Sequence, residues 1–209
     1  MSEAGSERAA ASSPETEEQG RANLYGLVSR LFYGPPDPNL LAEISRGEPG
    51  ADGQEGDGEL VAAWRVLQEA CRGAYPAIVR QEYDSLFVGV GKAPVTPYLS
   101  AYAEPNSPDR YLVRLRQQLV AWGLARRQSV FEVEDHVSGL SDVMRWLIEA
   151  QRPLADQRSF FKSFMYPGIV PFLAAVQHTP LASLYKLVAV FSLSFVELEK
   201  AAFEMDEGE

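Results

Sequence analysis

The residue types that most often carry out chemistry are sparse in this sequence of 209 residues. There are two histidines, His136 and His178, and a single cysteine, Cys71. They form no HExxH or CxxC pattern and no histidine pair at helical spacing, which argues against a zinc or iron site. A lone cysteine cannot form an internal disulfide, which fits a reducing cytoplasm. We therefore expect neither a bound metal nor a cofactor.

Sequence motifs of enzymes are also missing. Residues 89–92, Gly-Val-Gly-Lys, match a phosphate-binding loop only in part, because the GxxxxGK[ST] spacing is incomplete and no strand is predicted before them. There is no GxSxG elbow for a serine nucleophile, and no spacing of carboxylates singles out an acid and base pair. The sequence therefore predicts no catalytic residue.

Asp135 and His136 are the best candidates for a polar function. They stand at the start of a predicted helix, just after Glu132 and Glu134. Asp135 suits the N-cap position, where its carboxylate would accept a backbone hydrogen bond, and a histidine in the first turn is often merely exposed. The alternative is that the pair serves a polar function. The residues alone leave both interpretations open.

The elements that would position these residues are predicted to be helices. Apolar residues recur at helical spacing along most of the chain, and a capping residue or a proline precedes several of these runs. The predicted starts are residues 37–38, 75–76, 107–108, 135 and 180. No alternating strand pattern and no hairpin turn is present. The predicted fold class is all-α, a helical bundle with a hinge between a larger N-terminal and a smaller C-terminal unit.

The expected divisions of the chain follow its composition and its breaks in helical spacing. They are a disordered acidic tail (1–20), an N-terminal helical unit (21–122) containing a Pro-rich aromatic loop (88–108), a hinge (123–134), a C-terminal helical unit (135–204) and a second acidic tail (205–209). In the aromatic loop, Tyr98 and Tyr102 either fix the loop to the helices or contact a ligand. Helical spacing does not decide between these roles.

The net charge of −10 is concentrated in three segments. Residues 1–20 carry −4, residues 48–59 carry −5 and residues 204–209 carry −4, which leaves about +3 on the rest of the chain. Acidity of this kind favours solubility and argues against nucleic acid as a partner.

The sequence also carries no sign of export or of membrane insertion. Residues 1–20 lack the basic and apolar blocks of an export signal. The stretch 187–196 has ten residues, whereas a membrane span needs about 20. We expect a cytoplasmic protein with no membrane span.

Three separated blocks of sequence resemble a known family, the TorD/DmsD-type redox-enzyme maturation chaperones, relatives of the NarJ group. The blocks are Glu82-Tyr83-x-x-Leu86-Phe87-x-Gly89 followed by Pro94-x-x-Pro97-Tyr98-x-Ser100-x-Tyr102, then Glu132-x-x-Asp135-His136, then Thr179-Pro180-Leu181 through Leu198-Glu199. The resemblance covers roughly residues 22–203. Val133 stands where the family usually has proline.

The resemblance implies a function. It implies a cytoplasmic, all-helical chaperone, not an enzyme, that binds the twin-arginine signal peptide of a molybdenum-containing oxidoreductase and holds the apoenzyme until cofactor insertion. It implies a monomer or a domain-swapped dimer exchanged through the hinge. The implied peptide-binding residues are Pro97, Tyr98, Ser100, Tyr102, Glu132, Asp135 and His136.

Two other functions remain open at this point. One is a helical hydrolase that uses His136 with Asp135, although the sequence reveals no third polar partner for that pair. The other is a helical interaction scaffold with no peptide specificity. Recovery of a molybdenum oxidoreductase from the native cell would favour the chaperone over both.

Overall fold

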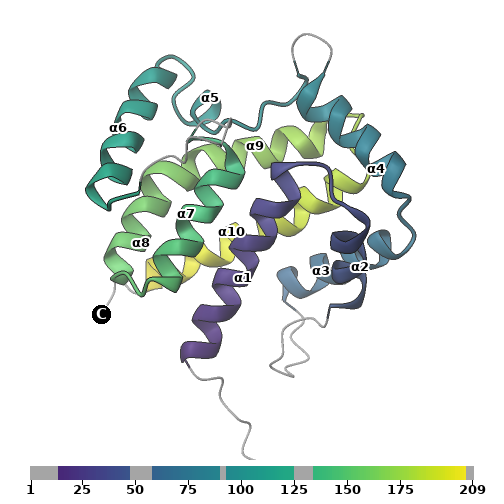
Figure 1. Cartoon of the computed structure of the whole chain (residues 1–209), viewed down its shortest axis with the longest axis horizontal. Helices are drawn as coiled ribbons and strands as arrows, with labels where there is room; N and C mark the ends of the chain where they lie inside the picture. The colour runs from purple at the N-terminus through teal and green to yellow at the C-terminus, as the bar shows by residue number, and fades with distance from the viewer. Residues whose placement is uncertain (1–13, 48–57, 90–92, 125–133, 206–209) are drawn as a thin grey trace, which may run out of the picture.

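Helices make up most of the computed structural model, which describes residues 14–47, 58–89, 93–124 and 134–205 (Figure 1). In chain order they are α1 (Pro14–Tyr33), α2 (Pro38–Arg46), α3 (Glu59–Arg72), α4 (Pro76–Tyr83), η1 (Asp84–Val88), α5 (Ser100–Ala103), α6 (Pro108–Ala121), α7 (Val137–Glu149), α8 (Leu154–Phe160), η2 (Phe161–Met165), α9 (Tyr166–His178) and α10 (Leu184–Met205). The two η segments are π-helical. Those four ranges contain no strand, only one isolated β-bridge, and the all-α prediction is confirmed.

Helix ends fall where turn chemistry predicts them in the first half of the chain. Asp37 caps α2, because its Oδ1 accepts the N–H of Leu40 at 2.8 Å, and Gly47 follows the last helical residue. Gly89, at φ +60°, ends η1 and donates its N–H to the carbonyl of Asp84. α6 also starts at the predicted place, although Ser107 makes no side-chain capping hydrogen bond.

The last helix begins later than predicted. A turn over residues 179–183 precedes α10, so the helix starts at Leu184 and not at Pro180. The carboxylate of Glu82, from α4, accepts the backbone N–H groups of Ser183, Leu184 and Tyr185 at 2.7, 3.1 and 2.8 Å. A distant side chain therefore caps α10 at its positive end.

The first helix corrects the predicted acidic tail over residues 1–20. α1 begins at Pro14, so residues 14–20 are helical, and residues 1–13 lie outside the described ranges. Glutamates near a helix N-terminus stabilise its dipole, and Glu18 accepts a hydrogen bond from Arg21 at 2.6 Å. The acidic residues of this segment therefore stabilise the start of α1.

A buried ion pair joins α1 to α10. Arg21 donates from Nε and Nη2 to the two carboxylate oxygens of Glu199, each at 2.8 Å, and the Tyr25 hydroxyl donates to the same carboxylate at 2.9 Å. Glu199 is 3% exposed. Burial lowers the pKa of Arg21, but hydrogen bonding and charge attraction from Glu199 outweigh burial and raise it overall.

The core does not separate at the predicted boundary between two units. α1 packs along α7, and α10 packs against α3 and α9 (Figure 1). The ring of Phe32 on α1 meets Phe87, Phe172 and Tyr185, with centroids 5.2 to 6.0 Å apart. The buried residues form one hydrophobic cluster that draws on both units. Residues 125–133, most of the predicted hinge, lie outside the described ranges.

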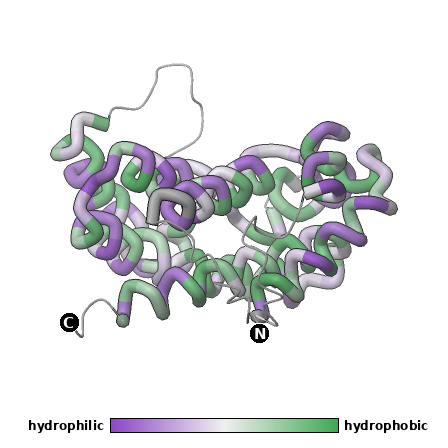
Figure 2. The backbone as a smooth tube through the Cα atoms, turned by 90° about the horizontal axis from the view of Figure 1, so that it is seen from below, coloured by the Kyte–Doolittle hydropathy of each residue, from purple (hydrophilic) through white to green (hydrophobic). Residues whose placement is uncertain are grey.

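Hydrophobic and hydrophilic residues alternate along the helices in Figure 2, a pattern typical of helices that place one face against a core. The segment 154–178, which spans α8, η2 and α9, is long and apolar enough by composition to cross a membrane. Half of its apolar window is buried inside the fold, and it packs against α5, α7 and α10. This pattern is usual for a core helix, and we interpret the segment as one.

Candidate functional site

The aromatic loop is attached to the start of α7. Tyr98 and His136 form an isolated antiparallel β-bridge, and the N–H of Leu99 donates to the carbonyl of Asp135 at 2.9 Å beside it. In a pair of this type the two side chains lie on one face and close together. The rings of Tyr98 and His136 meet edge to face, with centroids 5.4 Å apart.

Two further hydrogen bonds complete this attachment. The N–H of Val137 donates to the carbonyl of Pro97 at 2.9 Å, and the N–H of Ser100 donates to the carboxylate of Asp135 at 3.3 Å. We call the contact between residues 97–100 and 135–137 the loop clasp. It brings together, from distant parts of the sequence, five of the seven residues predicted to bind peptide.

Of the other two predicted residues, Tyr102 lies next to the clasp and Glu132 lies outside the described ranges. Tyr102 is half-buried at the end of the aromatic loop, and its ring meets Phe172 on α9 with centroids 5.9 Å apart. Burial raises the pKa of its hydroxyl. Tyr102 therefore packs the loop onto the core.

Asp135 is not the N-cap of α7, contrary to the sequence prediction. Its side chain is turned away from the helix and toward the loop, where it accepts the N–H of Ser100. Asp135 is only 2% exposed. The prediction failed because the helix begins one residue later than expected, at Val137, which moves the cap to the next residue.

His136 occupies the N-cap position instead. Its Nδ1 accepts the N–H of Ser138 at 3.2 Å and lies 2.7 Å from the Ser138 hydroxyl. Because Nδ1 accepts a backbone hydrogen bond, we place the ring proton on Nε2. The expectation of an exposed histidine is also wrong, since His136 is 3% exposed.

Gly168 on α9, which was not predicted to matter, sets how closely the aromatic loop approaches that helix. A Cβ added to Gly168 would lie 2.7 Å from both Cβ and the carbonyl oxygen of Leu99. Only glycine allows the two backbones to approach this closely. Its sequence signal, Pro-Gly within an apolar run, is weak because such pairs usually mark turns.

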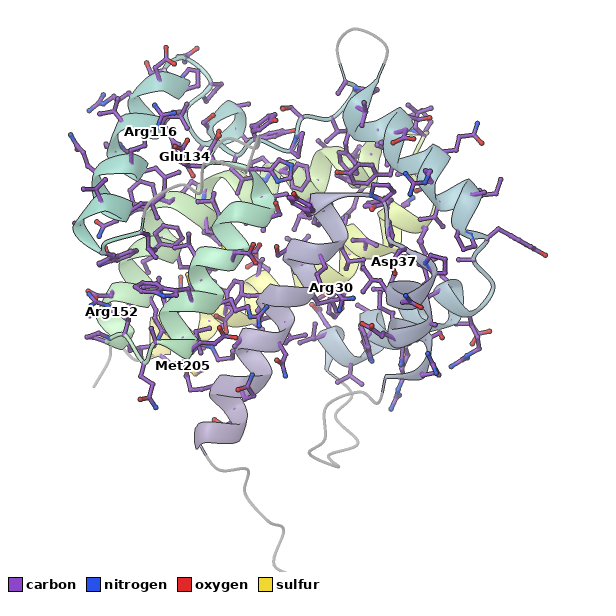
Figure 3. All side chains as sticks on the ribbon, in the orientation of Figure 1. Arg30, Asp37, Arg116, Glu134, Arg152 and Met205 are labelled. Atoms are coloured by element: carbon purple, nitrogen blue, oxygen red, sulfur yellow. The ribbon has the colours of Figure 1, made fainter. Side chains whose placement is uncertain are left out.

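An exposed arginine lies at the edge of the clasp. Arg116 on α6 and Glu134, just before Asp135, approach to 3.2 Å (Figure 3). Arg116 is half-exposed, whereas the Glu134 side chain is 16% exposed. This pair joins α6 to the residues that lead into α7.

The family of the chain follows from a match over residues 54–174 to the family described as nitrate reductase delta subunit. This match covers more than half of the sequence, including the loop clasp. The chain belongs to the nitrate reductase delta subunit family. Members are redox-enzyme maturation chaperones and not catalysts. The resemblance seen in the sequence blocks and the prediction of a non-enzyme are confirmed.

Two individual proteins are similar to this family member over most of its length. An uncharacterised protein of Haemophilus influenzae is 26% identical over 194 residues, and the similarity covers 88% of this chain and 96% of that protein. The crystal structure of a protein from Archaeoglobus fulgidus, described as a redox enzyme maturation protein, is 19% identical with a TM-score of 0.56. It covers 93% of this chain and 99% of its own, which supports the same fold.

The clasp geometry fits a family without catalysis. His136 and Ser138 lie within hydrogen-bonding distance, as a base and a nucleophile would, but both are buried, and the imidazole caps α7. Across the described ranges, no group of three or more His, Cys, Asp or Glu side chains is placed to hold a metal ion. Because the family consists of chaperones and His136 already caps α7, the hydrolase hypothesis is set aside.

Proposed function

We propose that this protein is a cytoplasmic chaperone for a molybdenum-containing oxidoreductase, whose twin-arginine leader it binds at the loop clasp. Its family and its fold support a role in redox-enzyme maturation. The client in this proposal is the catalytic subunit of the oxidoreductase, held until its cofactor is inserted. The protein acts as a monomer or a domain-swapped dimer and does not bind nucleic acid.

The observation that carries this proposal is the environment of Asp135. Its carboxylate is 2% exposed, and within the described ranges it has one hydrogen bond, at 3.3 Å, and no ion pair. A buried carboxylate with so few hydrogen bonds and no opposite charge destabilises the folded state. A guanidinium group supplies the charge and the paired donors that the carboxylate lacks. An arginine from a peptide is therefore a suitable partner.

Binding at this position requires the clasp to open. Asp135 and His136 are buried, so a peptide reaches them only after the loop separates from the start of α7. Three backbone-donated hydrogen bonds are then lost. Each contributes about 0.5–1.5 kcal/mol net, which new bonds to the peptide can replace. The protein thus alternates between a closed state, in which the clasp is formed, and an open state that binds the leader.

Isothermal titration calorimetry tests this function. A synthetic leader of a molybdenum oxidoreductase from the same organism is titrated into the full-length protein, and we expect binding. Asp135→Asn keeps the shape and removes the charge, so affinity should fall about tenfold or more, or 1.4 kcal/mol. A twin-lysine leader should bind the parent less well, because lysine lacks the planar fork of arginine.

The outcomes separate clearly. A parent protein that does not bind the leader would contradict the proposed function. Leader binding that is equally tight for the parent and for Asp135→Asn would leave the chaperone function in place but would remove Asp135 from the site.

A further inference from the structure

An apolar groove lies between α3 and α10, away from the loop clasp. It has a volume of about 390 Å³ and is lined by Glu59, Ala62, Ala63, Val66, Leu187, Val190 and Ser194. Val66 is 53% exposed and Val190 is 38% exposed. Two valines from neighbouring helices therefore face solvent at a groove of ligand-binding size.

Small side chains on α3 create this groove. α3 and α10 are packed together through Trp64 and Phe191, whose ring centroids are 5.2 Å apart. Beside this contact α3 carries Ala62 and Ala63, which are too short to fill the space between the helices. Core packing thus fixes α3 and α10 relative to each other, and the groove between them stays open.

A single carboxylate lies at this apolar surface. Glu59, the first residue of α3, lines the groove, and no hydrogen bond or ion pair joins its side chain to any other part of the chain that the structure describes. The remaining lining residues are uncharged. The groove therefore suits a segment that is mostly apolar and carries a positive charge at one border.

We infer that this groove binds the apolar stretch of the client's leader, with Glu59 facing a basic residue at the border of that stretch. The inference rests on the proposed function and adds a second contact surface to it. With the twin arginines of the leader at Asp135, the groove takes the apolar stretch of the leader and Glu59 faces a further basic residue at the border of that stretch. The chain's own acidic ends, residues 1–20 and 204–209, carry the same sign as Glu59 and are poor occupants.

The test compares matched aspartate substitutions in the full-length protein. The probe is the same synthetic twin-arginine leader, labelled with a fluorophore and followed by anisotropy. Val66→Asp and Val190→Asp should each weaken binding at least tenfold, because they place a charge where apolar surface is buried. Val113→Asp is the control, since Val113 on α6 is 51% exposed and lies outside the groove. It should change affinity less than twofold.

A second comparison tests the charge. Glu59→Gln should weaken binding by about two- to fivefold at low salt, the range for an exposed ion pair. Glu69→Gln, on the same helix but outside the groove, should have no effect. A photocrosslinker within the leader's apolar stretch should attach to peptides of α3 or α10. Melting temperatures of all variants should stay close to the parent, because the substituted positions are exposed.

Each outcome has one meaning. If the leader binds the parent and both valine variants equally well, the groove assignment is wrong and the proposed function stands. If the leader does not bind the parent, the proposed function fails and the groove assignment fails with it. If Val66→Asp leaves leader binding unchanged but dissociates a dimer seen by light scattering, the groove is an interface between copies, and the inference is overturned.

Discussion

Replacement of Glu199 by alanine is the sharpest test of how the fold is held together. The substitution removes the acceptor of three hydrogen bonds, two from Arg21 and one from Tyr25. Removing one partner of a buried ion pair typically costs about 3–5 kcal/mol. Arg21 keeps its pair with Glu18, and its side chain is 19% exposed, so we expect the lower end, about 3 kcal/mol.

For a protein of this size, 1 kcal/mol corresponds to roughly 2–4 °C in melting temperature, so Glu199→Ala should lower it by roughly 6–12 °C. The control is Glu149→Ala, which breaks an exposed pair with Arg145 on one helix. That pair is worth about 0.3–0.5 kcal/mol, or at most about 2 °C. Differential scanning calorimetry of both variants, with matched urea titrations, measures the difference.

A double variant separates pair loss from packing loss. Glu199→Leu with Arg21→Met removes both charges, so it should melt closer to the parent than Glu199→Leu alone. Equal melting temperatures for Glu199→Ala and Glu149→Ala would refute the assignment of a buried, stabilising pair. A double variant less stable than either single variant would refute the charge argument.

Three further predictions concern single residues. Gly168→Ala should lower the free energy of unfolding by about 1–3 kcal/mol, because the added Cβ forces the aromatic loop away from α9. Chemical denaturation measures this change, and an unchanged stability would show that the loop and α9 do not approach closely. Glu82→Gln should lower the free energy of unfolding by about 1 kcal/mol and speed amide hydrogen exchange at residues 183–185, because the Glu82 carboxylate caps α10. Glu69→Gln is the control and should change neither quantity. Burial raises the pKa of Cys71 to about 11. The thiol of the native protein should therefore react with iodoacetamide at pH 8 about a hundredfold more slowly than the thiol of the protein unfolded in urea, and its rate should rise with pH. Equal rates in the native and unfolded states would contradict this prediction.

Local chemistry explains which helix ends the sequence predicted. Asp37 with Pro38 starts α2 as expected, because capping depends on the residue itself and its nearest neighbours. The fold class was predictable for the same reason, since apolar spacing is local. The family resemblance likewise depended on short blocks that a single sequence displays.

Long-range contacts explain what the sequence did not predict. Asp135 looked like an N-cap, but its partner is Ser100, in a loop 35 residues earlier in the chain. Residues 14–20 looked like a tail, but the helix they open is fixed by Arg21, whose partner Glu199 is 178 residues away. Each of these pairings joins residues far apart in the chain, and no local sequence pattern reports them.

The position of α10 has a consequence for the timing of folding during protein synthesis. The helix near the end of the chain supplies Glu199 to α1, receives its cap from Glu82, and uses the Tyr185 hydroxyl to bond the carbonyl of Leu31. Ribosomes add about 5–20 residues per second, so α4 waits roughly 5–20 seconds for these partners and α1 waits longer. Until α10 emerges, the nascent protein lacks one wall of its core, and a partly made chaperone is itself a chain in need of protection.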